Sequence, residues 1–148
     1  MQEIKSSEIN HPEIKEFIDL VKTDIQNGVI EYQVLQEPRY MKYWKQLSIS
    51  EYVESDDTFK FIFVGTEITT YLGREFTGIT TREMLSDDSL YKLSYDMNIK
   101  VIKNKQLVYS YGNFEWENKE LVKWEAVTLS AQKSSEIPLC LTFSVHFR

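Results

Sequence analysis

Cysteine is almost absent from this sequence, since Cys140 is the only one among 148 residues. A single cysteine cannot form a disulfide within the chain, so the cross-links of small secreted domains are missing. Residues 1–17 carry charges where a signal peptide needs an apolar run, and no other segment is apolar over the length of a membrane span. We therefore expect a cytoplasmic protein without a membrane partner.

Basic residues are outnumbered by acidic ones, 17 against 23, which leaves a net charge of −6. Negative charge repels phosphate backbones, so we expect no nucleic acid as a partner. The only histidines, His11 and His146, are not spaced with other ligands in a zinc-binding pattern, and no metal is expected. Gly65, Gly73 and Gly78 are too far apart for a Walker loop or a dinucleotide motif.

Catalytic groups are scarce as well. A Ser or Cys nucleophile needs a base within hydrogen-bond reach. Cys140 and His146 alternate onto the same face of one expected strand, but six extended residues separate them by roughly 20 Å. We therefore expect a protein that is not an enzyme.

Aromatic side chains are abundant, with eight Phe, nine Tyr and three Trp making up 14% of the residues. The length suits one domain that can bury a core without disulfides or metal. The aromatic side chains either fill this core or line a cavity within it. Composition alone favours the filled core.

A helix is expected over residues 12–27, with Asn10 as its cap, Pro12 in its first turn and Gly28 after its end. Apolar residues recur along it at spacings of three and four. These residues are Ile14, Phe17, Ile18, Val21 and Ile25. Such a stripe must be covered, and we expect it to form a dimer interface, with burial in its own chain as the alternative.

The next segments predict a hairpin followed by helices. Residues 49–53 and 59–64 alternate like strands around a polar turn, and Phe59, Phe61 and Phe63 are expected to share one face. Short helices should follow, one over residues 66–72, capped by Thr66 and ended by Gly73, and one after the capping box at residues 80–83. Before the hairpin, the apolar residues at 40–47, after Pro38, predict a short second helix. After the short helices, a longer helix is expected over residues 89–105. Its stripe consists of Leu90, Leu93, Met97 and Val101.

From Leu107 onward the period changes to two. Residues 107–116, 120–131 and 137–147 predict three antiparallel strands, with a bulge at Gly112. The last strand alternates so regularly that one of its faces should contact solvent. Two strands, then helices, then three strands predict an α+β fold.

With this order of elements, the chain resembles the PAS-domain superfamily, and within it short stand-alone bacterial PAS-like proteins. The matching segments are YMKYWKQL, FKFIFVGTEITTYLGREFTGITTREML, LVYSYGNFEWENKELVKWEAVTLSAQ and IPLCLTF. They cover most of residues 40–143. The resemblance implies a five-stranded antiparallel sheet with short helices over one face. Residues 1–28 would then be an N-terminal cap helix and residues 29–148 a single PAS-like domain.

The resemblance also implies a regulatory sensor that binds a small molecule and signals through contact with another protein or with a second copy of itself. By position, the ligand-binding residues would be Phe63, Tyr71, Leu72, Tyr95, Ile99, Tyr109, Trp124 and Phe143. The alternatives are a ligand-free adaptor or dimerisation module with a filled core, and a small enzyme or carrier of cone-shaped α+β fold.

Two cofactors of such sensors can be tested against the sequence. Flavin photosensors use a cysteine in a helical N-C-R-F-L motif, which is missing here, and Cys140 falls instead in the last expected strand. Haem sensors commonly use a histidine of the long helix, and residues 89–105 contain none. We expect neither cofactor, with His146 as the one open candidate for haem.

Overall fold

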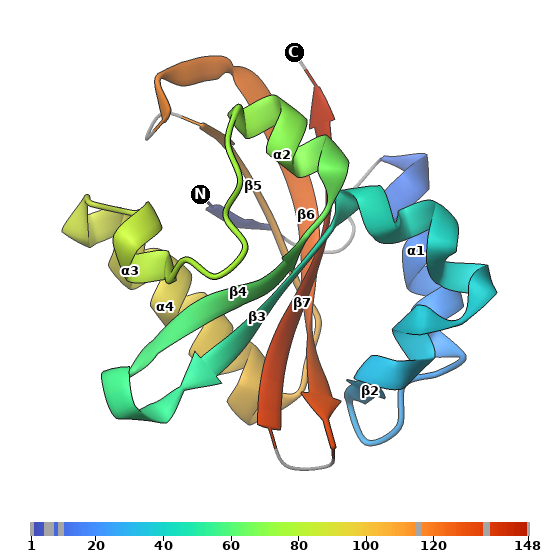
Figure 1. The fold of residues 1–148 in the computed structure, drawn as a ribbon. Coiled ribbons are helices and arrows are strands. Elements are labelled where there is room, and N and C mark those ends of the chain that lie inside the picture. The colour runs from blue at the N-terminus through green and yellow to red at the C-terminus, as the bar shows by residue number, and fades with distance from the viewer. Residues whose placement is uncertain (1, 5–7, 9–10, 115–116, 135–136, 148) are drawn as a thin grey trace.

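The computed structural model describes residues 2–4, 8, 11–114, 117–134 and 137–147, which fold around one twisted sheet (Figure 1). The sheet is mainly antiparallel, and its five long strands are neighbours in the order β5 (Val108–Phe114), β6 (Lys119–Lys133), β7 (Ile137–Phe147), β3 (Leu47–Val53) and β4 (Thr58–Val64). Two short strands extend it. They are β1 (Gln2–Ile4), antiparallel to β5, and β2 (Val29–Glu31), parallel to β6. The fold is therefore α+β, with seven strands in the sheet where five were expected.

Helices cover both faces of this sheet (Figure 1). One face carries α1 (Pro12–Lys22) and the 3-10 helices η2 (Tyr32–Gln36) and η3 (Pro38–Gln46). The other carries α2 (Thr66–Leu72), α3 (Thr81–Met84) and α4 (Asp88–Asn104), and η4 (Glu54–Asp56) joins β3 to β4. Because both faces are covered, β7 is not the strand with one solvent-facing side that its alternation predicted.

The apolar stripe of α1 belongs to the main core. Phe17 stacks on Phe143 of β7 with ring centroids 4.5 Å apart, and Tyr43 meets it edge-on. The expected dimer interface is therefore wrong for this stripe, because the second sheet face needs cover and α1 supplies it. The stripe residues Ile14, Phe17, Ile18 and Val21 are buried, and Ile25 packs against the same core.

The helix α1 ends at Lys22 and not at residue 27, because the Thr23 hydroxyl donates to the Leu20 carbonyl, 2.7 Å away, and the chain turns. Asn27 and Gly28 then have positive φ values of 53° and 79°, as a tight turn requires. The expected cap, Asn10, lies outside the described residues.

The ends of α2, α3 and α4 follow local sequence signals. Gly73 ends α2 with φ 80°, as expected, although Gly65 and not Thr66 is the N-cap residue. Thr80 accepts a hydrogen bond from the backbone N–H of Glu83, and Asp87 caps α4 in the same way. In the expected stripe of α4, Val101 is buried and Met97 borders the cavity described below, but Leu93 is half exposed, so the stripe is wrong at Leu93.

A bulge changes the direction of the β4 side chains. Ile49 pairs with Phe63 while Ser50 pairs with Phe61, so one residue of β4 is left without a partner. Phe59 and Phe61 consequently face α2–α4, whereas Phe63 packs in the main core. The expectation that these three rings share a face is wrong at Phe63.

The second expected bulge is also displaced. The register of β5 and β6 shifts between Asn113 and Phe114, not at Gly112. Phe114 therefore faces the helices α2–α4, whereas Tyr109 lies on the opposite face of the sheet.

Candidate ligand-binding site

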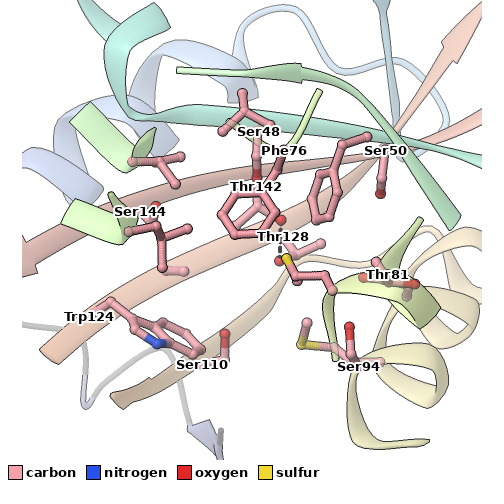
Figure 2. A pocket seen from close by; sticks show the side chains of 18 of the residues that line it. Ser48, Ser50, Phe76, Thr81, Ser94, Ser110, Trp124, Thr128, Thr142 and Ser144 are labelled. Atoms are coloured by element: carbon pink, nitrogen blue, oxygen red, sulfur yellow. Dashed lines mark hydrogen bonds between the residues drawn. The ribbon is translucent and has the colours of Figure 1, made fainter. Parts of the chain in front are cut away.

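A cavity of about 160 Å³ lies between the sheet and the helices α2–α4 (Figure 2). The five long strands β3–β7 supply its floor, and α2, the α2–α3 segment, α3 and α4 supply its walls. An apolar cavity of about 150 Å³ engineered into another protein binds benzene. The volume therefore suits a molecule with one six-membered ring, well below the roughly 300–1,000 Å³ of drug-sized pockets.

Small hydroxyl side chains form the middle of the floor. Ser48, Thr142 and Thr128 lie in register across β3, β7 and β6, and the Oγ1 atoms of the two threonines are 2.9 Å apart. In the next row Ser144 and Ser110 flank one alanine of β6 (Figure 2). These side chains are short, so they leave space beneath the helices, and this space is the cavity.

At one end the floor becomes aromatic. Trp124 and His146 are paired across β6 and β7, and the imidazole lies between Tyr71 and Phe114, with ring centroids 5.0 and 5.6 Å away. Burial lowers the pKa of His146 to about 4, which keeps it neutral at pH 7. Its Nε2 lies 3.4 Å from the Ser144 hydroxyl, whereas its buried Nδ1 has no partner among the described residues.

The segment between α2 and α3 places the aromatic ring of Phe76 over the cavity. Phe76 is 1% exposed and lines the cavity. Gly73 and Gly78 on either side of it have φ values of 80° and 86°, which let the chain turn sharply. The Arg74 guanidinium lies 4.4 Å from the centre of the Phe76 ring and pairs with Glu117 at the β5–β6 turn. The segment is thus fastened from outside by an ion pair.

Several polar side chains with little exposure face the cavity and bond to no other residue that the structure describes. Asn98 of α4 is only 7% exposed, yet its side-chain amide bonds to no other described residue. The same holds for the hydroxyls of Ser50 and Ser110, which are 5% and 1% exposed. Buried polar groups are nearly always hydrogen-bonded, so these positions call for a water molecule or a ligand.

Two of the eight expected ligand-binding residues, Leu72 and Trp124, line the cavity. Tyr71 packs beside it, with its ring on His146. The other five lie elsewhere.

Phe63, Tyr109 and Phe143 pack on the opposite face of the sheet, in the core beneath α1. Their placement in the site is wrong for two reasons. Alternation along β5 and β7 turns Tyr109 and Phe143 toward α1, and it turns their small neighbours Ser110, Thr142 and Ser144 toward α2–α4. For Phe63 the reason is the bulge in β4, which turns this side chain to the face beneath α1.

Tyr95 and Ile99 belong to a separate cluster around Phe59 and do not line the cavity. The Tyr95 hydroxyl donates to Oδ1 of Asp57 at 2.6 Å, and Tyr52 donates to the same oxygen at 2.5 Å. These two bonds lower the pKa of Asp57, and the Asp57 carboxylate raises the pKa of Tyr95. Tyr95 therefore fastens α4 to the β3–β4 turn.

The residues that the sequence reasoning missed are short and uncharged. Along β7 the side chains that face the cavity include Thr142, Ser144 and His146, and β3 adds Ser48 and Ser50. A strand face in contact with solvent usually carries Lys or Glu. The lack of charge in the polar half of the alternation was thus a readable signal of a covered, partly polar face.

The described lining of the cavity contains few ionisable side chains. Among the described residues that line the cavity, His146 is the only one with an imidazole, carboxyl, amino or guanidinium group, and burial lowers its pKa to about 4. The Ser144–His146 pair lacks a carboxylate at Nδ1 to orient the imidazole. Within the described residues, no three Asp, Glu, His or Cys side chains are grouped so that they could hold a metal ion.

Comparison with family models, curated proteins and solved structures gives no match for this chain. In the part of the chain that the structure describes, no helix is long and apolar enough to cross a membrane. Its function must therefore be inferred from the geometry of the cavity and of the elements around it.

Proposed function

We propose that this protein is a PAS-like regulatory sensor, which binds a small molecule in the cavity and signals through protein contact without catalysis of its own. The observation that carries the proposal is the cavity itself, about 160 Å³ in volume, with polar side chains that bond to no other described residue. A ligand-free adaptor with a filled core would have no need of such groups.

The order of the elements supports the PAS-like part of the proposal. A hairpin of β3 and β4 precedes the helices α2–α4, and the antiparallel strands β5, β6 and β7 follow them. The resemblance in sequence implies this layout, with the ligand between helices and sheet. The strands β1 and β2 and the cover provided by α1 are additions to it.

The α2–α3 segment offers a route for the signal. Phe76 lies against the cavity, and its neighbour Arg74 pairs at the surface with Glu117. A ligand that displaces the Phe76 ring would therefore disturb a surface ion pair that another protein, or a second copy of this one, could detect. Self-association is part of the proposal, through a surface other than the α1 stripe.

Native mass spectrometry of freshly purified protein tests the proposal. We expect a small non-covalent adduct on the parent chain and none on Ala126→Leu, whose larger side chain would fill the floor of the cavity. Circular dichroism should show that the variant is folded. If the parent carries no adduct and its NMR spectrum is unchanged by a low-molecular-mass cell extract, the adaptor alternative is favoured instead.

A further inference from the structure

The cavity places an aromatic wall next to a polar one. Phe61 is the cross-strand neighbour of Ser50, and Phe76 lies against Phe61 with ring centroids 6.4 Å apart. On the other side of Ser50, Cys140 is its neighbour in register, and the thiol of Cys140 donates to the backbone carbonyl of Asn98. A ring in contact with Phe61 and Phe76 would therefore lie close to Ser50 and Asn98.

The polar wall can form several neutral hydrogen bonds. The Asn98 amide offers two donors and one acceptor oxygen, and each serine hydroxyl can donate or accept. The Asn98 amide and the Ser50 hydroxyl bond to no other described residue, and both border the cavity. A ligand with a hydroxyl, carbonyl or amide group would satisfy them, whereas a hydrocarbon would leave them unpaired.

Charge is missing from the described lining of the cavity, which contains no Asp, Glu, Lys or Arg. An ionised ligand would lose its hydration on entering and would meet no opposite charge. The cavity therefore disfavours anions and cations alike.

We propose that the cavity selects a small neutral molecule in which one ring carries a hydroxyl, carbonyl or amide group, with the ring against Phe61 and Phe76 and the polar group on Asn98 and Ser50. This inference rests on the proposed ligand-binding function and adds the chemical class of the ligand.

Four single-ring probes test it: phenol, toluene, benzoate and benzylammonium. Binding is followed by NMR titration at pH 7, including the side-chain NH₂ signals of Asn98. A purely apolar cavity would prefer toluene, because phenol loses hydrogen bonds to water on entering. We expect the reverse order here, with phenol binding about tenfold tighter than toluene. The two charged probes should not bind at the same concentrations.

The variant Asn98→Leu separates recognition from structural support. Leucine keeps a similar size and removes the amide, so phenol should bind about tenfold more weakly and toluene at least as well. The unliganded variant should be no less stable than the parent, because an unpartnered buried amide is replaced by an apolar group. Asn104→Leu, on the exposed side of the same helix, is the matched control and should leave the phenol-to-toluene ratio unchanged.

The outcomes distinguish the two proposals. Tighter binding of toluene than of phenol by the parent, binding of a charged probe, or an unchanged ratio in Asn98→Leu would overturn the ligand class and leave the binding site standing. If neither neutral probe shifts any signal of the cavity residues, the ligand-binding function fails as well. Ser50→Ala, which removes the other proposed hydrogen-bonding group, provides a second test if Asn98→Leu does not fold, and it should also weaken the binding of phenol relative to toluene.

Discussion

His146 is held where a positive charge would be poorly solvated. Its ring lies between Tyr71 and Phe114, and no carboxylate bonds to it among the described residues. Burial therefore lowers its pKa from the ordinary 6.5 to about 4. Between these two pH values the unfolded chain binds a proton at His146 that the folded chain does not bind.

The stability of the protein should therefore depend on this one side chain in mildly acidic solution. Well above pH 6.5 the imidazole is neutral in both the folded and the unfolded chain, so it adds no pH dependence to the free energy of unfolding. As the pH falls from 6.5 to about 4, the free energy of unfolding should fall by up to about 3 kcal/mol on account of His146. In His146→Phe, which keeps a ring between Tyr71 and Phe114, this part of the pH dependence should disappear.

Urea unfolding of both proteins at pH 7, 5.5 and 4.5 measures the effect. Carboxylates titrate in the same range, so the relevant quantity is the difference between parent and variant. A difference that stays constant across the three pH values would show that His146 is protonated equally in the folded and unfolded chains.

At the scale of elements, one glycine sets how closely two helices approach. The backbone N–H of Gly65 donates to the Leu47 carbonyl at 2.7 Å, at the junction of β4 and α2. A Cβ at this position would lie 2.3 Å from the carbonyl oxygen of Lys45 and 2.4 Å from that of Trp44. Its φ of −65° is open to any residue, so space and not conformation requires glycine.

Gly65→Ala should therefore destabilise the protein by about 1–3 kcal/mol, because the added methyl group forces α2 and η3 apart. The free energy of unfolding in urea measures this cost. Thr66→Ala, at the exposed next position, is the control and should change it by less than about 0.5 kcal/mol. Equal stability of Gly65→Ala and the parent would mean that α2 and η3 can separate freely.

The element scale also shows what the sequence could predict. The end of α2 at Gly73 and the cap at Thr80 were predicted correctly, because each depends on residues within one turn. The environments of the two faces of β7 were not predicted correctly. Alternation shows that the two faces of a strand differ, but it does not show which helices cover each face. Phe143 and Thr142 were for this reason assigned to the wrong sides, and most of the cavity lining was missed.

At the scale of the whole molecule, the first helix and the last strand share one core. Figure 1 shows α1 beside the sheet, whose edge strand β1 pairs with β5. Phe17 of α1 is fully buried against Phe143 and Tyr40, which are fully buried too. Without α1, the apolar side chains of β7 beneath it would lose their cover. Residues 1–28 are therefore expected to be needed for folding, whatever boundary the domain is given.

A chain of residues 29–148 should consequently fail to unfold as one cooperative unit, because the face of the sheet beneath α1 would be exposed to water. Urea unfolding followed by fluorescence and circular dichroism measures this, with the full chain as reference. Two point variants grade the effect. Phe17→Ala should cost about 3–5 kcal/mol, while Lys15→Ala, on the exposed side of α1, should change little. If residues 29–148 unfold as cooperatively as the full chain, α1 is a detachable cap, and its stripe becomes available again for contact with a second copy.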